Sequence, residues 1–192
     1  DFVPERRMNA PIAQSGADQA ILRDSSIFRV YNTNEGLNGA RTSYFHKSLG
    51  GYHAAKPSRI QDSFEFHVYK DNRRVLNMMN TKYIIGSNEE GAPTVSLNPG
   101  ALGNAWFVEE LIAVPDANAA ILALDTLDVA NNAVFNRADF PQRAPRSFTV
   151  DSTATIRLER YRPNRLRYRS ENPEAGMAVF SEMYYSHGWQ AY

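Results

Sequence analysis

The stretch Asn72-Arg-Arg-Val-Leu-Asn-Met-Met-Asn-Thr-Lys-Tyr-Ile-Ile85 decides the fold class, because it predicts a helix that runs directly into a strand. Residues 72–80 place their apolar side chains at the spacing of one helical face. This stripe consists of Val75, Leu76 and Met79. Residues 82–85 form a short stretch that ends in apolar side chains, as expected of a strand. Residues 94–97 predict another strand after a turn. A helix and strands in close succession predict an α+β fold.

The same patterns predict further elements on both sides of this stretch. Upstream, helical segments and one strand are expected at residues 18–23, 26–31, 41–49 and from 58 onward. Downstream, residues 105–111 predict one strand, and Asp116 is placed to be the N-cap of a helix. The buried face of that helix is expected to consist of Ala119, Ile121, Leu122, Leu124 and Leu127.

The last part of the chain has the patterns of β-structure. Residues 154–159 and 165–169 alternate apolar with charged side chains, and Pro163-Asn164 is suited to the turn between them. Residues 177–185 are apolar on both faces, which predicts a central strand. An antiparallel β layer is therefore expected at the C-terminal end.

A segment rich in proline and charge, residues 137–147, is the expected internal boundary. We predict a mixed sheet with a few helices over residues 1–146. An antiparallel portion over residues 147–192 would pack on it and be truncated at its C-terminus. The first residue is Asp1, which indicates a piece excised from a longer protein.

Composition excludes several classes of function. Of 192 residues, 43% are hydrophobic and 22% are charged, which is ordinary for a folded domain. Lysine and arginine number 21, as do aspartate and glutamate, so overall charge does not favour a nucleic acid partner. The absence of cysteine excludes thiol catalysis, disulfides and cysteine-based zinc sites. No apolar run reaches the roughly 18 residues that a membrane helix needs.

The loop that follows residue 45 is the densest in chemically useful side chains. Gly50-Gly51 allows a tight turn whose N–H groups face an anion. Two interpretations remain open: a pocket for a phosphate or sugar head-group, or a structured turn with satisfied hydrogen bonds. The candidate binding residues are His46, Lys47, Tyr52, His53, Lys56 and Arg59.

A second candidate site lies near the end of the chain. A carboxylate beside aromatic rings is a common arrangement for sugars, because rings stack on CH groups while acids accept hydroxyls. The candidate binding residues here are Glu182, His187 and Trp189. The alternative is a core strand followed by a packed tryptophan.

Six arginines lie between residues 157 and 169, and three of them, Arg165, Arg167 and Arg169, would share one strand face. They could meet anionic lipid head-groups or a phosphorylated glycolipid. Alternatively they form a solvated face paired with glutamates.

The sequence holds no self-contained catalytic motif, so we predict no catalytic residue. Adjacent glutamates such as Glu109-Glu110 point to opposite faces of a strand and cannot act as a glycosidase pair. The four histidines lack the spacing that places two ligands on one helical face, so no metal site and no cofactor are predicted.

Four strings carry a resemblance to the YfhO-like family of bacterial membrane proteins, and they span nearly the whole chain in order. They are Ser43-Tyr-Phe-His-Lys-Ser-Leu-Gly-Gly-Tyr-His-Ala-Ala-Lys56, Val75-Leu-Asn-Met-Met-Asn-Thr-Lys-Tyr-Ile-Ile85, Leu102-Gly-Asn-Ala-Trp-Phe-Val108 and Ser181-Glu-Met-Tyr-Tyr-Ser-His-Gly-Trp189. The chain departs from the family's pattern at Pro57 and Ile60, where the family has Leu and Tyr.

The resemblance implies a location and a role. The family's members look like polytopic membrane proteins similar to glycosyltransferases that use lipid-linked sugars. This chain would be a non-catalytic domain on the extracytoplasmic face of the bacterial cytoplasmic membrane, tethered through flanking helices absent from it. It would bind or orient a glycopolymer or a polyprenyl-phosphate sugar. A structural or protein-interaction domain of the cell envelope, without a ligand, is the alternative, and a free-standing hydrolase is a third.

Overall fold

The structure, a computed structural model, describes residues 12–185 and 187–192. Its helices are α2 (Gly16–Ile21), α3 (Thr42–Phe45), α4 (Ser58–Phe66), the 3-10 helix η1 (Val68–Lys70), α5 (Arg73–Met78) and α6 (Ala117–Ala123). Its strands are β1 (Arg29–Asn32), β2 (Thr81–Ser87), β3 (Pro93–Leu97), β4 (Ala105–Val108), β5 (Glu110–Val114), β6 (Asn132–Asn136), β7 (Arg146–Ser147), β8 (Thr155–Arg162), β9 (Arg165–Glu171) and β10 (Met177–Phe180). The predicted α+β class is confirmed.

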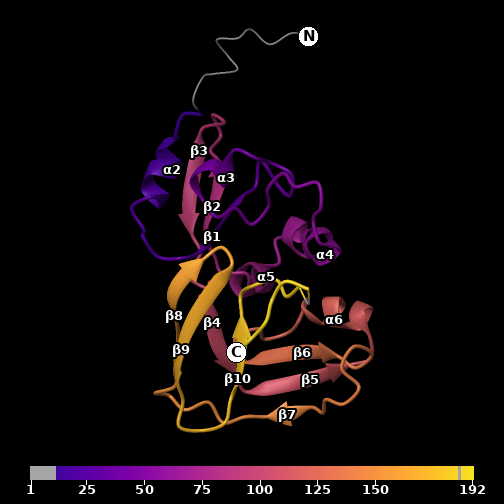
Figure 1. Ribbon diagram of the computed structural model, residues 1–192. Coiled ribbons are helices and arrows are strands. Elements are labelled where there is room, and N and C mark those ends of the chain that lie inside the picture. Colours follow the sequence, from indigo (N-terminus) through magenta and orange to yellow (C-terminus); the bar gives the residue numbers. More distant parts are fainter. Residues whose placement is uncertain (1–11, 186) are drawn as a thin grey trace.

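The first half is built around a mixed sheet of order β1-β2-β3, in the upper part of Figure 1. β1 runs parallel to β2, and β3 runs antiparallel to β2. The predicted helix and strand of the deciding stretch are α5 and β2. The Asn72 side chain caps α5 by accepting from the Arg74 N–H, and Asn80 turns the chain into β2 with φ of 53°.

The hydrophobic core lies between this sheet and the helices. The predicted stripe of α5 is confirmed, since Val75 and Leu76 are fully buried and Met79 nearly so. They belong to a cluster with Phe64 of α4 and Ile84 of β2. A second cluster under α2 joins its residues to β1 and β2 and consists of Ala17, Ile21, Phe28, Val30 and Ile85.

The predicted single strand over residues 105–111 is wrong, because the chain changes sheets at Glu109. β4 pairs antiparallel with β10, whereas β5 pairs with β6 in parallel and with β7 in antiparallel. The Glu109 N–H donates to the Asn131 carbonyl, and the Glu109 carbonyl accepts from Phe148. These bonds move the strand from one set of neighbours to another.

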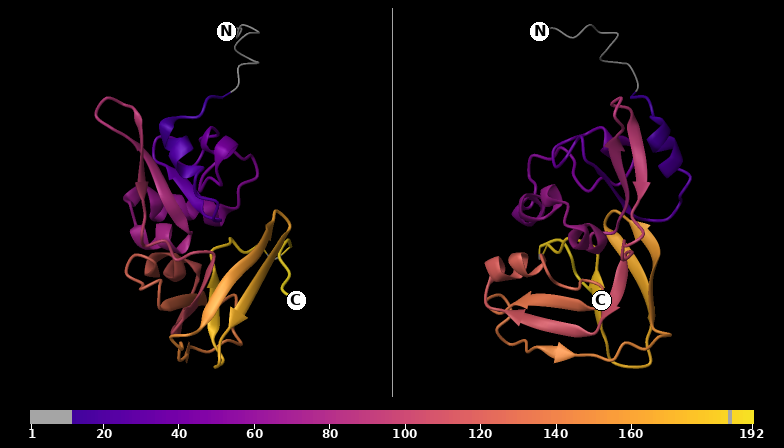
Figure 2. Two further views of the ribbon diagram at one scale, coloured as in Figure 1. Left: turned by 90° about the vertical axis from the view of Figure 1, so that its left-hand side faces the viewer. Right: turned by 180° about the vertical axis from the view of Figure 1, so that it is seen from behind.

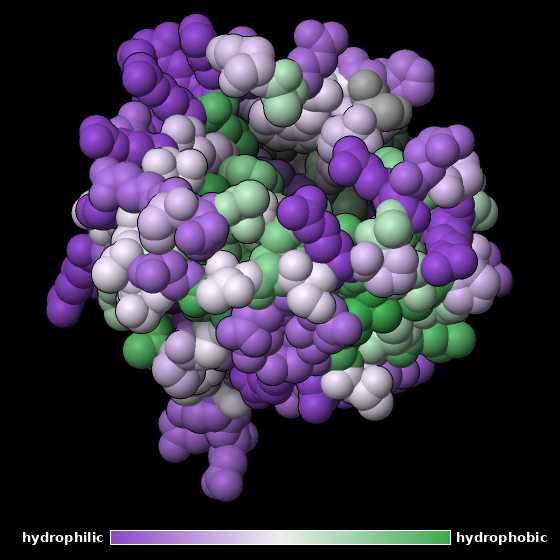
Figure 3. Space-filling model, turned by 90° about the horizontal axis from the view of Figure 1, so that it is seen from below, coloured by the Kyte–Doolittle hydropathy of each residue, from purple (hydrophilic) through white to green (hydrophobic). Residues whose placement is uncertain are grey.

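The predicted buried face of α6 is only half-buried, and the prediction is wrong for Leu122. Asp116 caps the helix as expected, accepting from the Ala119 N–H at 2.8 Å. No residue of the helix is buried, however, and Leu122 is 54% exposed. The helix lies at the margin of the molecule beside β5 and β6, so only one side of it meets other elements (Figure 1). Figure 3 shows hydrophobic surface among hydrophilic residues on the face seen from below.

The predicted central strand over residues 177–185 is shorter and more peripheral than expected. β10 ends at Phe180 and pairs, within the described residues, with β4 alone. A neighbouring layer contacts β10 through the side chain of Phe180. The Phe180 ring meets the Tyr168 ring edge-on at 4.8 Å between centroids.

That layer is the hairpin β8–β9, which forms an outer sheet (Figure 2). It was predicted from the alternation of side chains and from Pro163-Asn164, and Arg162 pairs with Arg165 on either side of the turn. Residues 147–192 also return to the first part, because β7 pairs with β5 and β10 with β4. The two parts are therefore joined by shared sheets.

Candidate functional site

The predicted loop site does not come together as one pocket. His46 points inward to Asp18, with 3.0 Å between His46 Nε2 and Asp18 Oδ1. The exposed Lys47 instead lies over the ring of Tyr161, with 3.6 Å from its ammonium nitrogen to the ring centroid. These two side chains, although adjacent in sequence, therefore contact different parts of the molecule.

The other loop residues diverge as well. Lys56 Nζ donates to the Leu37 carbonyl at 2.7 Å and to Asn38 Oδ1 at 3.1 Å, and burial lowers its pKa. His53 Nδ1 accepts from the Ala55 N–H at 3.1 Å. Tyr52 is 78% exposed, and Arg59 is exposed on α4. Lys56 and His53 thus stabilise the loop itself.

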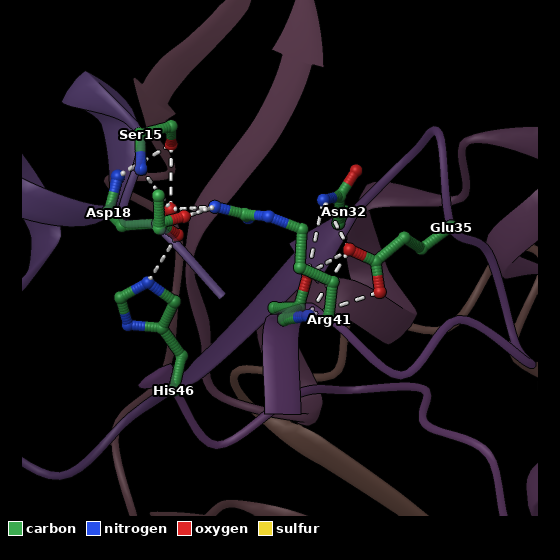
Figure 4. A network of polar contacts seen from close by, with 8 residues as sticks. Ser15, Asp18, Asn32, Glu35, Arg41 and His46 are labelled. Atoms are coloured by element: carbon green, nitrogen blue, oxygen red, sulfur yellow. Dashed lines mark hydrogen bonds and ion pairs between the residues drawn. The ribbon is translucent and has the colours of Figure 1, made fainter. Parts of the chain in front are cut away.

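The Asp18 network fastens α2 to this loop (Figure 4). Asp18 is fully buried and belongs to a capping box with Ser15. Its carboxylate also accepts from the Arg41 guanidinium and faces His46. Burial acts to raise the pKa of Asp18, but the hydrogen bonds from Arg41, Ser15 and His46 hold that pKa well below its usual range.

A second carboxylate completes this part of the molecule. Glu35 accepts from the Thr42 N–H and hydroxyl and from the Asn32 amide, with 2.8 Å to the Thr42 hydroxyl. The Asn32 amide also donates to that hydroxyl at 3.0 Å. Both carboxylates are saturated by partners on neighbouring segments, as expected of groups that hold a fold together.

The predicted C-terminal cluster is only partly assembled. Glu182 Oε2 accepts from Arg29 Nη2 at 2.9 Å, and His187 is exposed. The His187 ring lies 5.5 Å from the Tyr185 ring, and Trp189 is half-buried, with its backbone N–H donating to the Tyr185 carbonyl.

The structure instead brings Glu182 together with Lys47, one residue from each predicted cluster. Both line a cavity of about 200 Å³ between the first part of the chain and the hairpin β8–β9. Its lining consists of Ile27, Phe28, Arg29, Lys47, Ser48, Asn80, Asn104, Tyr161 and Glu182. We call this the junction pocket.

Arg29 organises one wall of the junction pocket. Its Nη1 donates to the Met79 carbonyl at 3.0 Å and to the Ser181 carbonyl, while its Nη2 binds Glu182. The charge of Glu182 is thereby balanced by Arg29. The ammonium of Lys47 has no such counter-charge among the described residues, so the lining carries one excess positive charge.

Two amides form a second wall. The Asn80 amide donates to the Ile27 carbonyl at 3.0 Å, and the Asn104 amide donates to the same carbonyl at 3.1 Å. The Asn80 amide also lies 3.3 Å from Asn104 Oδ1. Amides held in this way present oriented polar atoms to a ligand.

Tyr168 lies close to this pocket on the inner face of β9. Its hydroxyl is buried and has no hydrogen-bond partner among the described protein groups. Burial, followed by the nearby Glu182 carboxylate, raises the pKa of Tyr168 to about 12. The hydroxyl therefore stays protonated at neutral pH and can donate a hydrogen bond.

Sequence reasoning found two residues of the pocket and missed the others. Arg29, Asn80, Asn104 and Tyr161 come from four separate segments. Asn80 and Asn104 lie within two of the strings that carry the family resemblance, but no local pattern marked any of the four as a site residue. Topology, rather than spacing along the chain, assembles the site.

Comparison with known proteins assigns no family: no protein-family model, no curated protein and no solved structure matches the chain. Over residues 12–185 and 187–192, no three histidines or carboxylates are placed to hold a metal ion. Within that same part of the chain, no helix has both the length and the apolar character to cross a membrane.

Proposed function

We propose that the chain is a non-catalytic, extracytoplasmic ligand-binding domain of a polytopic membrane protein that resembles glycosyltransferases using lipid-linked sugars. Its ligand would be the sugar-phosphate portion of a glycolipid or an anionic glycopolymer, held in the junction pocket. The observation that carries the proposal is the convergence of Lys47, Tyr161 and Glu182 on one cavity.

The chemistry of the lining supports a sugar phosphate. The Tyr161 ring, with Lys47 over one of its faces, offers apolar surface for CH groups, while Glu182 and Asn104 offer partners for hydroxyls. Lys47 supplies a positive charge without a carboxylate partner, so an anionic group would gain a charge-assisted hydrogen bond. A neutral sugar would lack that contribution.

The same lining does not favour hydrolysis. Glu182 is its only carboxylate among the described residues, and that side chain is held by Arg29. Glycoside hydrolysis ordinarily needs two carboxylates on opposite sides of the bond. A binding role therefore agrees better with the geometry than a catalytic one.

Binding can be tested by calorimetric titration of the protein with glucose 1-phosphate and with glucose. We expect glucose 1-phosphate to bind more tightly than glucose. Lys47→Met should weaken the binding of glucose 1-phosphate about 10- to 150-fold, because a charge-assisted hydrogen bond contributes about 1.5–3 kcal/mol. The matched control is Lys70→Met, since Lys70 also lies over a ring, that of Phe66, but outside the pocket. Equal affinity for both compounds, unaffected by Lys47→Met, would contradict the proposal.

Location needs a separate test. Spheroplasts that express the longer parent protein are treated with an external protease and then probed with an antibody against this segment. We expect the antibody to show that the segment has been cleaved. Protection from protease in intact spheroplasts, with cleavage only after lysis, would contradict the extracytoplasmic location.

An alternative is a structural or interaction domain of the envelope without a ligand. The internal bonding of His46 and Lys56 favours it, because these residues of the predicted loop site are already satisfied. Loss of a partner complex on mutation of the loop, with sugar-phosphate binding absent in the wild type, would favour this alternative.

A further inference from the structure

The hairpin β8–β9 pairs arginine with arginine across its strands. In this antiparallel register three arginines of β8 stand directly opposite three arginines of β9. The pairs are Arg157 with Arg169, Arg160 with Arg167, and Arg162 with Arg165. Like charges directly opposite one another destabilise a sheet, so this arrangement works against the stability of the hairpin.

An irregularity in the register places all six on one face. Strict alternation along β8 would send Arg157 and Arg160 to opposite faces. The register shifts between Leu158 and Arg160, so that Glu159 is the extra residue and Arg160 returns to the face of Arg157. The six side chains are exposed, whereas Leu158, Tyr161, Leu166 and Tyr168 on the other face are half-buried.

Acidic neighbours balance only part of this charge. Arg167 pairs with Glu159 at 3.3 Å, and Arg169 with Glu171 at 3.1 Å. Arg157, Arg160 and Arg162 have no ion pair among the described residues. Arg165 lies 5.5 Å from the centroid of the Tyr192 ring, which is itself 94% exposed. We call these six arginines together the arginine face.

We propose that the arginine face docks on a bilayer surface that contains anionic phospholipids. A guanidinium binds phosphate through two parallel hydrogen bonds, and six of them on one ribbon match an array of head-groups. The exposed Tyr192 ring beside Arg165 is of the kind that lies at the membrane–water interface. Because the whole chain has a net charge of zero, attraction would come from this local face.

The choice of a bilayer over nucleic acid rests on Tyr192, because an exposed tyrosine ring beside a cationic face is typical of the membrane–water interface. Binding to a nucleic acid is one outcome of the test. This inference is independent of the junction pocket, which opens between the hairpin and the first part of the chain, so either proposal can fail alone.

The test is co-sedimentation of the full chain with vesicles of phosphatidylcholine alone and of phosphatidylcholine mixed equally with phosphatidylglycerol. We expect binding to the anionic vesicles only, decreasing with added salt. Replacing Arg157, Arg160, Arg162 and Arg165 by Gln should lower partitioning on the order of 10²–10³-fold, because each arginine near an anionic surface contributes about fivefold.

A matched variant controls for net charge. Arg23, Arg59, Arg137 and Arg143 are exposed, and their side chains form no hydrogen bond or ion pair with the part of the chain that the structure describes. Replacing these four by Gln therefore removes the same charge elsewhere. This control should bind anionic vesicles as the wild type does, and circular dichroism should show both variants folded. Equal losses in both variants, no binding by the wild type, or equal binding to neutral vesicles would each overturn the proposal. So would tighter binding of the wild type to a DNA duplex than to anionic vesicles.

Discussion

Residues 12–104 and residues 105–192 differ in how many apolar side chains they bury. In the first region, apolar side chains from α4, α5 and the β1-β2-β3 sheet are buried in two clusters. In the second region, Val108 and Val129 are the only buried apolar side chains that the described residues contain. Its strands form thin layers whose side chains are mostly half-exposed.

The polar groups differ in the same way. The first region buries Asp18, Thr42 and His67 completely and pairs them, whereas the second sets arginines opposite one another on an exposed face. Buried packing is therefore concentrated in the first region, and opposed surface charges in the second. Three predictions test this contrast.

The largest effect is expected from removing a ring of the core. Phe64 is fully buried, so Phe64→Ala should lower the free energy of unfolding by about 4 kcal/mol. Phe180→Ala, in the second region, removes a ring that is 44% exposed and should cost less than half as much. Urea denaturation of both variants measures the two values. Equal losses would mean that the second region contributes as much packing as the first.

An intermediate effect is expected from the Asp18 network. Asp18→Asn leaves Arg41 and His46 facing a neutral group and should cost about 3 kcal/mol. Because the folded pKa of Asp18 is depressed, its contribution is present above the usual carboxyl pKa of about 4 and is lost as pH falls below it.

The pH dependence distinguishes this network from a local one. Stability of the wild type should fall more steeply than that of Asp18→Asn as the pH is lowered from about 4. The control is Asp151→Asn in the second region, where the carboxylate is bonded only to the nearby Thr153 and the change should be within about 0.5 kcal/mol. Parallel pH profiles for wild type and Asp18→Asn would contradict the ion pairing.

The smallest effect, of opposite sign, is expected on the arginine face. Arg160→Thr removes a like-charge pair and adds a β-branched residue. The free energy of unfolding should therefore increase by about 0.5 kcal/mol. Arg167→Thr relieves the same pair but gives up the bond to Glu159, so its gain should be smaller. Thermal denaturation compares them. A loss of stability in Arg160→Thr would show that Arg160 is bound within the protein.

The elements that sequence predicted best are those with a clear period. The stripe of α5 and the alternation of β9 depend on local spacing, and both are confirmed. The arginines of β8 could not be assigned to the face of those on β9, because the extra residue at Glu159 changes the phase of the strand. A bulge leaves no mark in the alternation that distinguishes it from a regular strand with mixed polarity.

The candidate site was predicted in pieces. Lys47 and Glu182 were recognised as useful side chains, but their predicted companions lie elsewhere. His46 was expected in a ligand pocket, yet its ring is buried against Asp18, on a helix that begins 30 residues earlier. Such a partner depends on the path of the chain between the two positions, which residue spacing does not contain.

The ion pair between Arg29 and Glu182 also determines when the junction pocket can form during protein synthesis. Arg29 is joined to Glu182 across 153 residues of sequence. At a translation rate of roughly 5–20 residues per second, Glu182 leaves the ribosome on the order of 10 s after Arg29. During that interval the nascent chain contains Arg29 but not yet Glu182, the carboxylate that pairs with it. The wall of the junction pocket that Arg29 and Glu182 form together is therefore complete only once Glu182 has been synthesised.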